Sequence, residues 1–170
     1  AAAGVPRRER GRRVDEALRV LPDLIAGKPA AVGGISGQDP ELVELSPGAT
    51  VPPILVGGMS DAALRRTVER ADGWFALPAP PAAIGTVRDR LAELAAELER
   101  DVPSITGAVM AALTGDPALP DRDGLRRALT DPDGKYGMPA DAVDETLLVG
   151  DPSVLAERIR RLAAVGAERV

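Results

Sequence analysis

Short apolar runs alternate with amphipathic stretches along residues 52–75, and this pattern predicts a strand, a turn and a helix in close succession. Two prolines precede the apolar run Ile54 to Val56, which is typical of a buried parallel strand whose start lies outside the hydrogen-bonded ladder. Gly57 and Gly58 follow at once. Because glycine lacks a Cβ atom, this pair predicts a tight turn whose backbone lies close to whatever sits above the strand end.

The helix predicted after this turn has a single apolar side. Ser60 is a favourable N-cap, and apolar residues recur at helical spacing over residues 64–71 while charged residues fill the other faces. Asp72-Gly73 ends the helix, and Trp74-Phe75 begins a second strand. The stretch is therefore predicted to be a compact βαβ unit whose helix packs on a sheet.

The same spacing rules predict elements on both sides of this unit. In the last helix, Leu155, Ile159 and Leu162 are expected to form the inner face. The predicted helices cover about residues 8–26, 84–98, 124–129 and 152–165, and further strands are predicted at 104–113 and from 167 to 170.

Two irregular segments interrupt this alternation within a predicted single domain over residues 1–170. Residues 28–50 are rich in glycine, proline and small residues, and we expect a connector or lid there. Residues 114–147 form the longer insertion. It carries Lys135 and Tyr136, either as a lid over the strand ends or as a solvated loop.

Alternating strands and helices predict an α/β fold with parallel strands. Right-handed crossovers bring the carboxyl ends of parallel strands to one rim. Gly57, Gly58, Ala76, Leu77 and Leu113 are expected to meet there, so this rim is the predicted site.

The glycine turn at this rim has a specific chemical potential. A helix N-terminus offers unpaired N–H groups and a positive dipole end, which together favour a phosphate. A plain strand-to-helix turn is the alternative, and Asp61 would repel an anion. Asp131, Asp133 and Lys135 resemble part of a calcium loop but lack its terminal glutamate, so we expect no metal there.

Composition narrows the chemistry further. The chain has no histidine and no cysteine, so any general acid or base within it is a carboxylate, Lys135 or Tyr136. A net charge of −5 argues against a broad nucleic-acid surface. No apolar run approaches the roughly 20 residues of a membrane span and no signal peptide is visible, so we expect a cytoplasmic protein without a membrane partner.

The order PPILVGG and then SDAALRRTVERADGWF resembles the luciferase-like flavin-dependent monooxygenases and their deazaflavin-dependent relatives. In that family the pattern spans the fifth strand, fifth helix and sixth strand of a (β/α)8 TIM barrel. GVPRRERGRRVDEALRVLPDLIAGKP is similar to the family's preceding helix, and VGDPSVLAERIRRLAAVGAERV to its last helix and eighth-strand entry. The resemblance implies the second half of such a barrel, with about three to four parallel strands and flanking helices.

This resemblance also implies a cofactor and a function. FMN or a deazaflavin coenzyme would rest its phosphate on the amides of Gly57, Gly58 and Ser60, with its ring near Ala76, Leu77 and Trp74. The implied activity is that of a flavin- or deazaflavin-dependent oxidoreductase acting on a small organic substrate. The family's histidines near the flavin have no counterpart here, so no catalytic residue is assigned.

Two other functions remain open. One is a non-catalytic flavin-binding or interaction module derived from the same fold, and the other is an unrelated flavodoxin-type binding domain. A half sheet with open edges and an apolar inner face is costly in water. We therefore expect a truncated portion of a larger barrel, self-association, or pairing with a complementary barrel half.

Overall fold

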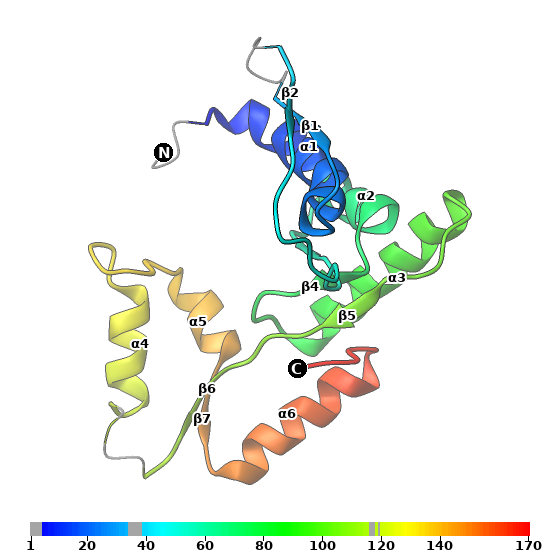
Figure 1. Cartoon of the computed structure of the whole chain (residues 1–170). Helices are drawn as coiled ribbons and strands as arrows, with labels where there is room; N and C mark the ends of the chain where they lie inside the picture. The colour runs from blue at the N-terminus through cyan, green and yellow to red at the C-terminus, as the bar shows by residue number, and fades with distance from the viewer. Residues whose placement is uncertain (1–4, 34–38, 116–117, 119) are drawn as a thin grey trace. The chain divides into compact units, whose positions relative to one another are not determined.

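The computed structural model describes residues 5–33, 39–115, 118 and 120–170 (Figure 1). The chain divides into two compact units, Ala1–Ile54 and Leu55–Val170. The second unit contains all the residues of the predicted site. Each unit is described by itself below.

The described residues of the first unit form one helix and a small hairpin. Helix α1 (Arg7–Ile25) ends just before Gly27, as the apolar spacing predicts. Strands β1 (Ala30–Val32) and β2 (Glu41–Val43) pair antiparallel. The segment predicted as a connector or lid thus contains a hairpin, and its residues 34–38 lie outside the described part of the chain.

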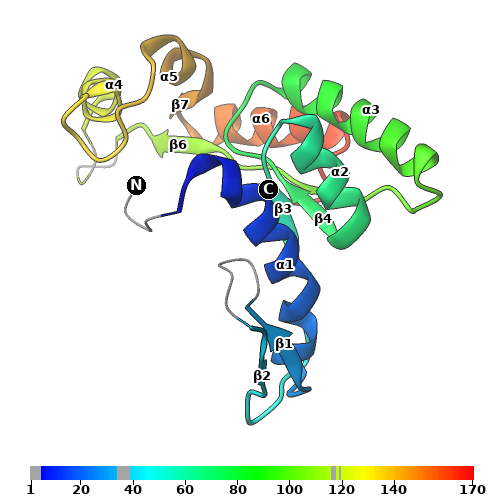
Figure 2. The same cartoon turned by 90° about the horizontal axis from the view of Figure 1, so that it is seen from above.

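A parallel sheet forms the centre of the second unit (Figure 2). Strands β3 (Leu55–Gly57), β4 (Gly73–Phe75) and β5 (Ser104–Thr106) lie side by side in that order. A parallel bridge between Thr106 and Arg169 adds the chain's last residues beside β5, where the sequence predicts the start of a strand. The predicted βαβ unit is confirmed.

Helices cover one face of this sheet. Helix α2 (Asp61–Arg70) and helix α3 (Pro81–Glu97) supply apolar side chains that pack with the strand residues Trp74 and Ile105. Leu162 of α6 (Pro152–Ala164) joins the same core. The core residues are Leu64, Val68, Trp74, Ala76, Ile84, Val87, Leu91, Leu94, Ala95, Ile105, Leu162 and Ala167.

The single strand predicted over residues 104–113 is wrong. After β5 the buried Gly107 donates its N–H to the carbonyl oxygen of Arg169 at 2.8 Å, which ties the backbone to the C-terminal segment. The chain then forms a separate strand, β6 (Met110–Leu113), which pairs in parallel with β7 (Leu147–Gly150). Residues of one apolar run therefore belong to two different sheets.

The described part of the predicted insertion contains two short helices. Helix α4 (Arg122–Thr130) contains the short helix expected near Leu129. Helix α5 (Ala140–Thr146) and strand β7 were not predicted. A bidentate pair joins α4 to α5, with Arg126 donating to the Asp144 carboxylate at 2.6 and 2.9 Å. This pair lowers the pKa of Asp144, chiefly through the hydrogen bond from Arg126.

The inner face predicted for the last helix is only partly correct. Leu162 is buried and Leu155 is half-buried, but Ile159 is 45 % exposed. Helix α6 meets the core through its C-terminal half, where Arg88 of α3 donates to the carbonyl oxygen of Val165 at 3.3 Å. Ile159 therefore lies on a more exposed side of α6 than Leu162 does.

We expect Leu91→Ala to destabilise the second unit by about 2–5 kcal/mol, because Leu91 is fully buried and its loss leaves a cavity. Leu77→Ala is the matched control, since Leu77 is 71 % exposed and its truncation should cost less than about 0.5 kcal/mol. Urea unfolding followed by the fluorescence of Trp74, the chain's single tryptophan, measures both changes. Equal losses for the two variants would contradict the assigned core.

Candidate functional site

The carboxyl ends of β3, β4 and β5 lie side by side, and register decides which side chains share a face there. Val56, Trp74 and Ile105 are aligned across the three strands and are buried under the helices. Because successive strand residues point to opposite faces, the next aligned set presents the other face. That set consists of Gly57, Phe75 and Thr106.

The glycine turn after β3 is held in place by Trp74. The indole is 2 % exposed, and its Nε1–H donates to the carbonyl oxygen of Gly58 at 2.9 Å. Gly58 has a φ of +116°, which side-chain-bearing residues rarely adopt. A Cβ atom on Gly58 would also approach the Cβ of Ala63 to 2.9 Å. The turn therefore has one fixed conformation that requires glycine.

Helix α2 begins with its first amides open. Ser60 is the N-cap, and its hydroxyl oxygen accepts from the N–H of Ala63 at 3.3 Å. Within the described residues, the N–H groups of Asp61 and Ala62 have no hydrogen-bond partner. Gly57, Gly58 and Ser60 are all exposed. The start of α2 thus combines a neutral cap with unpaired donors that face solvent, which is the arrangement an anion requires.

The repulsion expected from Asp61 is offset by Arg90 of α3. The guanidinium donates to both carboxylate oxygens of Asp61, at 3.3 and 3.1 Å. This hydrogen bond, and then the positive charge of Arg90, lowers the pKa of Asp61. Arg90 also contacts Glu93 and Glu97 at 2.9 and 3.7 Å. Asp61 is thus ionised but engaged, so it opposes a bound anion less than a free carboxylate would.

Other helix starts in the second unit are less suited to an anion. Asp151 caps α6 by accepting from the amides of Ser153 and Val154, and the hydrogen bond from the Ser153 side chain is the main cause of its lowered pKa. Asp121 caps α4 in the same way. Helix α3 has Pro80 as N-cap and Pro81 in its first turn, so two donors are missing. Among these helices, α2 alone combines a neutral side-chain cap with free amides.

The structure separates the residues predicted for the site. The Gly57-Gly58 turn, Ser60 and the exposed Leu77 lie at the carboxyl end of the sheet, as expected. Trp74 and Ala76 are buried in the core beneath it, where they hold the turn and the strand end. Cofactor binding by these six residues remains a prediction.

Leu113 does not belong to this rim. It ends β6, which pairs with β7 rather than with β3, β4 or β5, so its predicted convergence with the glycine turn is wrong. Lys135 and Tyr136 are exposed, and the Lys135 ammonium lies 5.3 Å from the centre of the Tyr136 ring. Their assignment to a lid stays a prediction.

Three residues at the rim were missed by the sequence analysis. Phe75, Thr106 and Arg169 share the register row that begins at Gly57. The strand alternation held the signal, because the buried Trp74 implies that Phe75 points to the opposite face. Arg169 could be placed only from the bridge to Thr106.

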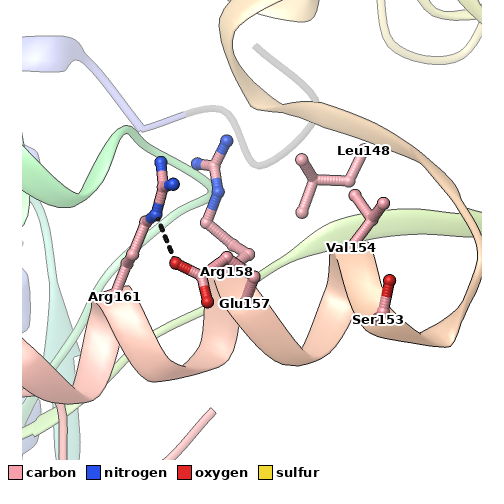
Figure 3. Close-up of a pocket in the computed structure, with 6 residues that line it drawn as sticks. All are labelled: Leu148, Ser153, Val154, Glu157, Arg158 and Arg161. Carbon is pink, nitrogen blue, oxygen red and sulfur yellow. Dashed lines mark hydrogen bonds and ion pairs between the residues drawn. The ribbon is translucent and has the colours of Figure 1, made fainter.

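Among the described residues of the second unit, two cavities are prominent, and the glycine turn lines neither of them. The first, of about 380 Å³, lies beside α6 and β7. Figure 3 shows Arg158 and Arg161 directed to the same side of it, with Arg161 bound to Glu157. It is lined by Leu148, Ser153, Val154, Glu157, Arg158 and Arg161.

The second cavity, of about 410 Å³, is lined by residues that include Asp72 and Pro103, which directly precede β4 and β5. It therefore lies at the amino ends of the strands. We place the candidate site at the glycine turn, because the carboxyl end of a parallel sheet is where such folds bind ligands.

No group of metal-binding side chains occurs among the residues described. In the same residues, no helix has the length and apolar character needed to cross a membrane.

These features define a βα-repeat protein with an exposed, glycine-rich turn at the carboxyl end of its parallel strands and open amides at the start of the following helix. A family model for luciferase-like monooxygenases matches residues 1–118, and the chain belongs to this family. The resemblance drawn from the sequence is therefore confirmed.

Curated relatives cover only part of this match. Uncharacterised proteins of Mycobacterium bovis and Mycobacterium tuberculosis are 44 % identical over 73 residues. This alignment covers 42 % of the chain and 25 % of each relative. The matched stretch is thus about a quarter of the length of those proteins.

Solved structures share the fold over nearly the whole chain. An F420-dependent secondary alcohol dehydrogenase in complex with an F420-acetone adduct matches with a TM-score of 0.69 at 17 % identity. The match covers 98 % of this chain and 57 % of the dehydrogenase chain. The F420-dependent tetrahydromethanopterin reductase of Methanopyrus kandleri scores 0.62 at 16 % identity, with coverage of 94 % and 56 %. EDTA monooxygenase of Chelativorans sp. BNC1 scores 0.56 at 15 % identity, covering 96 % and 54 %. At these identities the similarity shows the fold alone, and the chain spans little more than half of each structure.

We expect Gly58→Ala to destabilise the chain more than Gly115→Ala does. Both glycines have a positive φ. No described residue lies within 4 Å of a Cβ built at Gly115, whereas a Cβ at Gly58 would also clash with the Cβ of Ala63. Strain alone should cost about 1 kcal/mol at Gly115, and the clash should add roughly 1–3 kcal/mol at Gly58. Urea unfolding of the two variants measures the difference, and equal costs would show that the turn is not fixed as described.

Proposed function

We propose that this chain supplies the cofactor-phosphate-binding part of a flavin- or deazaflavin-dependent oxidoreductase. The observation that supports this most strongly is the start of α2, where a neutral Ser60 cap leaves the amides of Asp61 and Ala62 open beside the glycine turn. Membership of the luciferase-like monooxygenase family and two F420-dependent structural neighbours support the same function.

The residues present fit such a cofactor. A phosphate group would accept hydrogen bonds from the Gly58, Asp61 and Ala62 amides, with the Ser60 hydroxyl adding one more. The glycine turn permits this approach because both glycines are exposed and carry no side chain of their own. Trp74 would keep the Gly58 carbonyl oxygen turned into the core, so that the amides rather than the carbonyl face the anion.

The bound FMN or deazaflavin ring would supply the redox chemistry, and the protein would bind and orient it. Leu77 and Phe75 are the exposed apolar side chains at the strand ends that a ring would contact. Trp74 and Ala76 would support that surface from beneath, because both are buried. A small organic substrate would occupy the open side of the ring.

Catalysis by the whole protein would need acid or base residues that this chain does not supply at the rim. The chain has no histidine, and within the described residues no buried carboxylate lies at the rim. Exposed apolar side chains near the strand ends support a covering partner, which would be a second copy or a complementary barrel half. These side chains are Met59, Phe75, Leu77 and Val170.

The second candidate is a module that binds the cofactor without catalysing a reaction. The absence of histidine, the commonest acid or base near neutral pH, favours it. Turnover measurements distinguish the two candidates. Both predict cofactor binding, but only the first predicts that the chain together with its covering partner oxidises a substrate.

Binding of FMN and of riboflavin to the purified chain tests the proposal. The two ligands differ only in the phosphate, so we expect FMN to bind at least about tenfold more tightly, as charge-assisted hydrogen bonds imply. Fluorescence titration measures both affinities, with coenzyme F420 as the third ligand. Failure of all three ligands to bind would overturn the proposal.

Arg90→Gln should weaken FMN binding about two- to fivefold, because Asp61 would then repel the phosphate at the helix start. Adding Asp61→Asn to this variant should restore the affinity. Riboflavin binding should be the same in all three proteins. If the double variant bound FMN as weakly as Arg90→Gln alone, a role of Arg90 that acts through the Asp61 charge would be excluded.

A further inference from the structure

Thr106 carries a buried hydroxyl without a hydrogen-bond partner in the described part of the chain. It lies at the carboxyl end of β5, and its backbone carbonyl accepts from the N–H of Ala76 at 2.9 Å. Leaving a buried hydroxyl unpaired costs about 1–3 kcal/mol. Such a group needs an explanation, and a ligand that pairs with it is one.

The neighbours of Thr106 in register are suited to a polar aromatic ligand. Phe75 lies on one side of it and is 39 % exposed. Arg169 lies on the other side, is exposed, and has no side-chain partner within the residues described. Gly57 completes the row beyond Phe75. An aromatic face, a hydroxyl and a guanidinium thus follow one another across the sheet, starting at the glycine turn.

This row lies on the face of the sheet opposite α2 and α3. Trp74 and Ile105, the residues before Phe75 and Thr106, point into the helix-covered core. A ligand whose phosphate rests on the start of α2 would therefore extend its ring along the row, from Gly57 toward Arg169.

We propose that Thr106 and Arg169 bind the carbonyl edge of the cofactor ring while the ring stacks on Phe75. This inference rests on the proposed function and assigns the ring-recognising residues of the same site. The Thr106 hydroxyl donates to a ring carbonyl oxygen. The Arg169 guanidinium lies near the same edge, where its charge favours the reduced, more electron-rich ring over the oxidised one.

Thr106→Val tests the hydroxyl, because valine keeps nearly the same shape without the donor. We expect riboflavin and FMN affinities to fall by the same factor, about three- to tenfold, since one hydrogen bond is lost. The free energy of unfolding should not fall, because the hydroxyl makes no bond within the described chain. A purely structural threonine would give the opposite result, with lower stability and unchanged binding.

Arg169→Gln tests the charge. The reduction potential of bound FMN should become more negative, and Arg169→Lys should restore part of the shift. Glu168→Gln is the matched control, because Glu168 is the exposed neighbour on the alternate face and should leave the potential unchanged.

The outcomes separate this inference from the proposed function. The ring assignment would be overturned if Thr106→Val left the riboflavin affinity unchanged and Arg169→Gln left the reduction potential of bound FMN unchanged. The phosphate site would still stand if the unmodified chain bound FMN more tightly than riboflavin. If the unmodified chain bound neither flavin nor coenzyme F420, both would be overturned. Parallel loss of riboflavin and FMN affinity in Thr106→Val, with unchanged stability, supports the assignment.

Discussion

The candidate site depends on the hydrogen bond from the Trp74 indole to the Gly58 carbonyl oxygen. The indole is the largest buried side chain of the core, so this bond connects the glycine turn directly to the packing of α2 and α3 on the sheet. It fixes which way the peptide after β3 faces. With the carbonyl oxygen held against the core, the following backbone leads to the open amides at the start of α2. Core packing thus determines the orientation of the proposed binding groups.

Electrostatics then distinguishes this helix start from those of α4 and α6. All of these helix starts carry the same backbone dipole, but an acidic cap at α4 or α6 already satisfies its amides with a negative charge. Ser60 satisfies one amide without adding charge. Asp61 would cancel this advantage if it were free, and Arg90 engages it through two hydrogen bonds. The suitability of α2 for an anion is therefore a joint property of its cap and of one arginine on the neighbouring helix.

Much of the fold could be predicted from the sequence because helices have long, redundant patterns. The apolar spacing behind Ser60 placed α2 correctly, and the Gly57-Gly58 turn was found from two residues whose backbone freedom is distinctive. Strands of three or four residues carry far less information, so β7 was missed and β5 was merged with β6. At the site, the turn could be predicted, but the Phe75, Thr106 and Arg169 row could not. That row depends on register between segments far apart in the chain, which no local pattern contains.

The central claim is that the amides beside Gly58 and at the start of α2 bind a phosphate-bearing cofactor. Backbone amide chemical shifts of the ¹⁵N-labelled chain, recorded during titration with FMN and with inorganic phosphate, test it most directly. The account predicts that both ligands shift the Gly58, Asp61 and Ala62 resonances, and that FMN also shifts Thr106. Shifts confined to Ser153 and Val154 at the start of α6, or absent from the residues beside Gly58, would contradict it.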